Sequence, residues 1–76
     1  MAIGLVEGGC PLTVNGSPRV VAEGTTLAQL LAMLAVDPRM IVVELNREIL
    51  RDRDRFDALT LCAGDTLELV HFVGGG

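Results

Sequence analysis

The chain has 76 residues, half of them hydrophobic, and a formal net charge of −4 at pH 7. This length predicts a single small domain. Six basic residues, all of them Arg, stand against ten acidic residues, and only two residues are aromatic, which excludes the basic surface of a nucleic-acid binder.

The two cysteines, Cys10 and Cys62, lie far apart, and neither belongs to a CxxC pair or a His cluster. This spacing excludes a zinc finger and an iron–sulfur site. We expect both thiols to be small hydrophobes, with Cys62 buried and inert beside Leu61. No secretory leader is recognisable, and no apolar run reaches the roughly 20 residues of a membrane span, so we expect a cytoplasmic protein without a membrane partner.

Residues 1–9 carry no clear pattern and fit either an N-terminal extension or the start of the first strand of a domain over residues 10–73. Residues 12–14 alternate like a strand, and Asn15-Gly16 then supplies the turn signal of a tight β-hairpin. Residues 19–21 are predicted to form the returning strand.

An amphipathic helix is predicted over residues 26–35. Thr26 and Gln29 have the spacing of a capping box at its start. An apolar stripe follows at helical spacing, widened by Met33: Leu27, Leu30, Leu31 and Leu34. Asp37-Pro38 is expected to end the helix, because Pro disfavours the α conformation in the residue before it.

The sequence of the second half of the chain predicts three strands. Residues 40–46 read as a central strand with Ile41, Val43 and Leu45 on its core face. A turn and a short strand at 48–50 follow, and then an alternating-sign run at 51–55 that we expect to be a solvated loop. Phe56 is expected to fill the core, and the last strand is predicted over 66–73.

These elements predict an α+β fold with a mixed sheet of four to five strands and one helix packed across one face. A right-handed crossover from the second strand to the third places the last strand in the centre, beside the first. This arrangement is the ubiquitin-like β-grasp.

Three glycines close the sequence at Gly74, Gly75 and Gly76. A Gly run offers no side chain to pack, and its backbone is slim and flexible. We expect a flexible C-terminal tail at 74–76, suited to a terminal carboxylate that is itself the reagent in another protein's active site. The alternative is an inert, frayed terminus.

Four stretches carry a resemblance to a known family: Val-Asn-Gly at 14–16, Gly-Thr-Thr-Leu at 24–27, Val-Glu-Leu-Asn at 43–46, and the run from Gly64 through His71-Phe72-Val73 to the three glycines. With them, residues 12–76 resemble the ThiS family, the ubiquitin-like sulfur carriers of thiazole formation in thiamine biosynthesis. The last stretch is the most specific of the four.

In that family the terminal Gly carboxylate is adenylated and then converted to a thiocarboxylate. The resemblance implies that Gly76 is the reactive residue. It also implies three partners: an E1-like adenylyltransferase (ThiF-like), thiazole synthase (ThiG-like) and a sulfur donor protein. ATP is used by the partner enzyme, and no cofactor is expected on this chain.

The sequence predicts a cosubstrate rather than an enzyme. The glycines at 74–76 are not followed by Lys-Ser/Thr, so they do not form a phosphate-binding loop. No Ser-His-Asp set has a meaningful spacing, and the single His71 cannot build a metal site. We expect a structural or interface role for His71.

A docking surface is predicted on the sheet face away from the helix. Alternation in the last strand directs Leu67 and Leu69 to the core and the intervening side chains to the opposite face. With the neighbouring strand, that face carries an exposed patch, the predicted partner-binding patch: Val42, Glu44, Glu68, Val70 and Phe72. Its acidic rim favours a basic partner.

Three other functions fit the sequence. The small subunit of molybdopterin synthase shares the fold, the tail and the activation chemistry. A ubiquitin-like modifier uses the same terminus to form isopeptide bonds. A β-grasp interaction domain with an inert tail needs no chemistry at all.

Overall fold

The computed structural model describes residues 9–72 of the chain. Most of the predicted N-terminal extension and the predicted tail at 74–76 lie outside the described residues, as does residue 73. The described chain forms five strands, one α-helix and two 3₁₀-helices: β1 (Gly9–Val14), β2 (Ser17–Ala22), α1 (Leu27–Met33), η1 (Pro38–Met40), β3 (Ile41–Leu45), β4 (Glu48–Leu50), η2 (Arg53–Arg55) and β5 (Thr66–His71).

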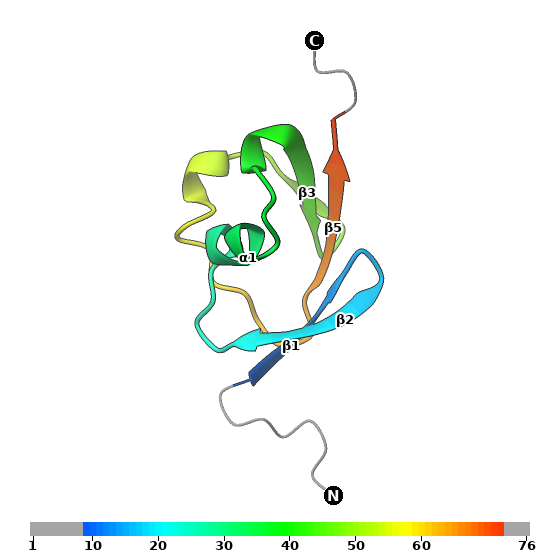
Figure 1. The fold of residues 1–76 in the computed structure, drawn as a ribbon, viewed down its shortest axis with the longest axis vertical. Coiled ribbons are helices and arrows are strands. Elements are labelled where there is room, and N and C mark those ends of the chain that lie inside the picture. Colours follow the sequence, from blue (N-terminus) through cyan, green and yellow to red (C-terminus); the bar gives the residue numbers. More distant parts are fainter. Residues whose placement is uncertain (1–8, 73–76) are drawn as a thin grey trace, which may run out of the picture.

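The five strands form one mixed sheet in the order β2-β1-β5-β3-β4, with α1 across one face (Figure 1). Strands β1 and β5 pair in parallel, whereas the other three neighbouring pairs are antiparallel. The last strand therefore lies in the centre beside the first, as the right-handed crossover rule predicts. The β-grasp prediction is confirmed.

Both hairpins turn on an Asn with positive φ. Asn15 has a φ of 49° and Gly16 one of 82°, and the second hairpin repeats this with 51° at Asn46 and 73° at Arg47. Positive φ at both central residues matches the twist of the flanking strands, which is why these turns were recognisable in the sequence. Arg47 is the unusual member, since a bulky residue rarely adopts this conformation.

The predicted capping box opens α1. The Gln29 N–H donates to Thr26 Oγ1 at 3.1 Å, and the Thr26 N–H donates to Gln29 Oε1 at 2.9 Å. A distant segment, residues 56–59, satisfies two further N–H groups of the first turn: the Leu27 N–H donates to the Leu59 carbonyl at 2.9 Å and the Ala28 N–H to the Phe56 carbonyl at 3.0 Å. The helix start is thus fixed by local and long-range partners together.

The helix ends at Met33, two residues before the predicted end. Ala35 adopts the left-handed conformation with a φ of 57°. The Val36 N–H donates to the Leu31 carbonyl at 2.9 Å, a pattern that closes a helix without proline. Met33 is 64 % exposed and does not widen the apolar stripe, so that prediction was wrong.

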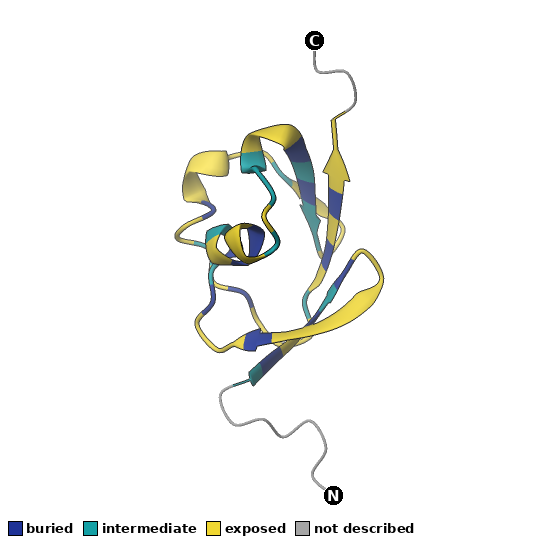
Figure 2. Ribbon diagram, viewed as in Figure 1, coloured by how far each residue is buried: buried dark blue, intermediate teal, exposed yellow. Residues whose placement is uncertain are grey.

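The core lies between α1 and the sheet. Figure 2 shows its alternating bands on the strands and its stripe on the helix. Leu27, Leu30 and Leu31 of α1 belong to one cluster with Ile41 and Val43 of β3, as predicted. The other members of this cluster are Cys10, Leu12, Val14, Val21, Phe56, Leu61, Leu67 and Leu69. Leu45 is half-buried at its edge.

The two turn asparagines also fix β5. The Asn15 side chain accepts from the Leu69 N–H at 2.7 Å and donates to its carbonyl at 3.3 Å. Asn46 Oδ1 accepts from the Thr66 N–H at 2.9 Å. Each amide bonds β5 on the side where the neighbouring strand has ended, β1 at Leu69 and β3 at Thr66, so the two amides help to set the position of β5.

Candidate functional site

The predicted partner-binding patch is a continuous surface in the fold. Val42 lies directly opposite Val70 on the neighbouring strand, and Glu44 lies opposite Glu68. Val70 is 59 % and Phe72 is 45 % exposed, whereas Val42 is half-buried. The structure therefore brings together all five residues that the alternation of two strands selected. Their binding role stays a prediction.

The surface continues onto β4, which the sequence analysis missed. Ile49 lies opposite Glu44 and is 45 % exposed. A groove of about 340 Å³ runs beside it, lined by Val42, Ile49, Leu50, Arg51, Arg53 and Phe72. The strand at 48–50 was predicted, but only its pairing register shows that Ile49 joins the patch.

Two arginines change the charge of the rim. Glu44 and Glu68 lie on one side of the apolar residues, and Arg51 and Arg53 flank the groove on the other. The prediction of an acidic rim was therefore only half right. The surface has an acidic side and a basic side, which complements a partner of mixed charge rather than a uniformly basic one.

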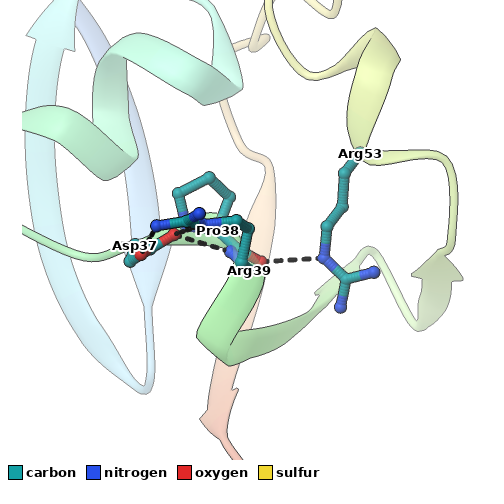
Figure 3. A network of polar contacts seen from close by, with 4 residues as sticks. All are labelled: Asp37, Pro38, Arg39 and Arg53. Carbon is teal, nitrogen blue, oxygen red and sulfur yellow. Dashed lines mark hydrogen bonds and ion pairs between the residues drawn. The ribbon is translucent and has the colours of Figure 1, made fainter.

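Arg53 is the exception in the run 51–55 predicted to be a solvated loop. It is exposed like its neighbours, but its Nε donates to the Pro38 carbonyl at 2.8 Å (Figure 3). Its Nη2 donates to the Ile41 carbonyl at 3.0 Å. Its guanidinium carbon also lies 5.8 Å from the centroid of the Phe72 ring. No spacing in the sequence links these residues.

The segment that receives Arg53 is braced by an ion pair. Asp37 caps η1 by accepting from the Arg39 N–H at 2.9 Å, and Arg39 Nη2 contacts Asp37 Oδ2 at 2.9 Å (Figure 3). The hydrogen bonds from Arg39 lower the pKa of Asp37 to about 2. Met40, the last residue of η1, accepts from the Phe72 N–H at 2.9 Å, so this small helix contacts the end of β5.

The two cysteines differ, contrary to prediction. Cys10 is buried in the core, and burial raises the pKa of its thiol. Cys62 is exposed, so the prediction that it is buried was wrong. The reason is the turn before β5: Asp65 Oδ2 accepts from the Cys62 N–H at 2.7 Å, and Leu61 rather than Cys62 enters the core.

The remaining predicted residues give no sign of catalytic chemistry within residues 9–72. His71 is exposed at the end of β5, opposite Ile41. In that range no group of three His, Cys, Asp or Glu side chains gathers as a metal site requires. No helix in the described part of the chain has both the length and the apolar character to cross a membrane. Gly74, Gly75 and Gly76 lie outside the described residues.

A mixed five-stranded sheet with a central parallel pair, one helix on one face and an apolar patch beside the last strand defines a ubiquitin-like β-grasp protein. Comparison with known proteins narrows the class. Residues 12–76 match the model of the ThiS family. The chain belongs to this family of sulfur carrier proteins, which confirms the resemblance drawn from the sequence.

Individual relatives support the family assignment. The chain is 41 % identical over 66 residues to the sulfur carrier protein ThiS of Bacillus subtilis, covering 86 % of this chain and 98 % of that one. It is 40 % identical over 63 residues to a thiazole synthase of Magnetococcus marinus, covering 83 % of this chain. It is 38 % identical over 65 residues to a thiazole synthase of Paramagnetospirillum magneticum, covering 86 % of this chain. The chain spans only 19 % and 20 % of the length of these two synthases.

Solved structures show the same fold. The crystal structure of the thiamine biosynthesis protein ThiS from Geobacter metallireducens superposes with a TM-score of 0.73 at 45 % identity, covering 87 % of this chain and 99 % of that one. A solution structure of a thiamine biosynthesis protein from the same organism gives a TM-score of 0.68, also at 45 % identity, covering 87 % of each chain.

Proposed function

We propose that this chain is the sulfur carrier of thiazole formation in thiamine biosynthesis, and that Gly76 carries the sulfur as a thiocarboxylate. An E1-like adenylyltransferase joins the Gly76 carboxylate to AMP from ATP, releasing pyrophosphate. A persulfide on a sulfur donor protein then displaces AMP, and a thiol cleaves the resulting acyl disulfide to leave the thiocarboxylate. Thiazole synthase accepts that sulfur. The chain binds no cofactor and acts in the cytoplasm as a cosubstrate.

Adenylation is the necessary step, because a carboxylate has no leaving group that a sulfur nucleophile can displace. The mixed anhydride with AMP provides one. The observation that carries the proposal is the extent of the family match, which runs from residue 12 through Gly76. It therefore includes the Gly-Gly-Gly sequence as well as the domain.

The two relatives named thiazole synthase support the choice of acceptor. Each contains a segment similar to this chain over about a fifth of its length. A sulfur carrier and the enzyme that consumes its sulfur are expected to be joined in this way. A molybdopterin carrier would instead deliver its sulfur to the large subunit of molybdopterin synthase.

We propose that the adenylating enzyme docks on the partner-binding patch. Val70 and Phe72 are apolar yet exposed; Val70 lies on the last strand and Phe72 directly follows it, on the way to Gly76. An exposed apolar cluster with charged sides is the usual form of a partner site. Docking there holds the enzyme within a few residues of Gly76.

Intact mass spectrometry tests the proposed function. The chain is incubated with ATP, the adenylating enzyme, a sulfur donor and a thiol. A carrier gains the mass difference between sulfur and oxygen, and omission of ATP abolishes the gain. A modifier appears joined to another protein, and an inert domain keeps its mass; either result refutes the proposal.

The matched control carries one Ala added after Gly76. The added residue removes the reactive carboxylate from Gly76 and moves the terminus by one position. We expect no gain of sulfur in this variant. Normal loading without prior removal of the Ala contradicts the assignment of Gly76.

A further inference from the structure

Arg53 joins its own segment, η2, to two parts of the chain that lie far from it in the sequence: residues 38–41 and Phe72. It begins η2, and its guanidinium reaches the carbonyls of Pro38 in η1 and of Ile41 at the start of β3, at 2.8 and 3.0 Å. The same group faces the ring of Phe72 just after β5. The Arg53 guanidinium, which the sequence analysis placed in solvent, therefore contacts two carbonyl oxygens and one aromatic ring.

These contacts converge on the point where β5 ends. The Phe72 N–H donates to the carbonyl of Met40, which lies between the two residues that accept from Arg53. The backbone of Phe72 is therefore held by η1, and its ring is held by Arg53.

Only Arg has the geometry for this role. Its guanidinium is planar, so it can donate from two nitrogens to two carbonyls while its face lies against an aromatic ring. A Lys ammonium carries the same charge but lacks the planar group with two donor nitrogens. Arg55, two residues on, has the same charge and the same exposed loop, and none of the described side-chain hydrogen bonds involves it.

We propose that Arg53 is a positioning residue for the C-terminal segment, acting through Phe72. By fixing Phe72, it sets the point from which the chain continues toward Gly76. A reactive group held in fewer orientations reaches a partner's active site more often. The inference rests on the proposed function for its consequence, but the Arg53–Phe72 contact can be tested without it.

The first test measures the contact itself. Amide hydrogen exchange of Phe72 and the chemical shifts of its ring are followed by NMR in full-length wild type, Arg53→Ala and Arg55→Ala. We expect Phe72 exchange to rise about fivefold in Arg53→Ala, with a shift of the ring signals, and to stay unchanged in Arg55→Ala. Equal exchange in the two variants overturns the proposal, whether or not the chain carries sulfur.

The second test measures the consequence in the ATP-dependent loading assay. We expect kcat/KM to fall about fivefold in Arg53→Ala and to remain at the wild-type value in Arg55→Ala, since both lose one positive charge. Arg53→Lys should recover part of the loss and also serves if Arg53→Ala does not fold. Wild-type loading by Arg53→Ala overturns the positioning role, whereas no loading of wild type refutes the proposed function instead.

Measuring the loading rate at different salt concentrations distinguishes a positioning role of Arg53 from direct binding of Arg53 to the enzyme. An ion pair with the partner weakens as salt rises, so the difference between wild type and Arg53→Ala would disappear at high salt. Contacts to carbonyls and a ring within the chain are screened far less. We expect the ratio of the two rates to be the same at low and high salt; its collapse at high salt would assign Arg53 to the interface.

Discussion

Replacing Phe72 by Ala should weaken binding to the adenylating enzyme while leaving the fold intact. Phe72 lies after the end of β5 and outside the core cluster. A Phe side chain has about 200 Å² of surface. With 45 % of the residue exposed in the free chain, about 90 Å² remains for a partner to cover. At about 25 cal/mol per Å², covering that area contributes about 2 kcal/mol, or roughly a thirtyfold change in Kd.

The assay is isothermal titration of the enzyme with each variant, with circular dichroism to verify the fold. Val70 and Val20 supply a matched pair, because they are 59 % and 60 % exposed but only Val70 belongs to the patch. Val70→Ala should weaken binding severalfold, and Val20→Ala, on the outer strand β2, should not. If Phe72→Ala binds within twofold of wild type, or if both Val variants behave alike, the patch is not the docking surface.

Four further predictions concern the scaffold. Asn15→Gly keeps the positive φ but removes both hydrogen bonds to Leu69, so the free energy of unfolding in urea should fall by about 1–2 kcal/mol; an unchanged value would contradict the role of the amide. Ala35→Gly relieves the left-handed strain at the end of α1 and should raise the free energy of unfolding by about 0.5–1 kcal/mol; a decrease would show that the strain is not there. Iodoacetamide should label Cys62 rapidly and Cys10 only on unfolding, as measured by peptide mass spectrometry, since one thiol is exposed and the other is buried with a raised pKa; labelling at equal rates would refute this. The lowered pKa of Asp37 gives a small stabilisation that is complete above its unfolded pKa near 3.8 and is lost as pH falls through about 2. The melting temperatures of wild type and Asp37→Asn should therefore differ slightly at neutral pH and converge near pH 2, whereas a difference that grows on acidification would contradict the assignment.

The opposite charges on the two sides of the partner-binding patch restrict how a partner can bind there. Glu44 and Glu68 lie on one side of the apolar residues, and Arg51 and Arg53 flank the groove on the other. A partner that complements both sides can dock in one orientation only, because the reverse orientation opposes like charges. One orientation is what delivery of a terminal group to a single active site requires.

Elements with local signals could be predicted from the amino-acid sequence alone. Asn15-Gly16 and Asn46-Arg47 impose their turns through backbone conformation, and Thr26 with Gln29 starts the helix within one turn. Alternation along the two neighbouring strands was enough to select the five predicted patch residues, since a strand has a period of two.

Contacts between residues far apart in the sequence could not be predicted and are seen only in the folded chain. The helix end depends on Ala35 adopting an uncommon conformation that no sequence pattern indicates. Cys62 is exposed because Leu61, whose N–H donates to the carbonyl of the distant Thr25, enters the core instead. Ile49 joins the docking face through the register of β3 and β4. In the sequence, Arg53 is one of several charges in an alternating run. That pattern does not indicate its contacts with the carbonyls of Pro38 and Ile41 and the ring of Phe72. Such contacts arise from packing three segments together, and the information for them is spread over the whole sequence.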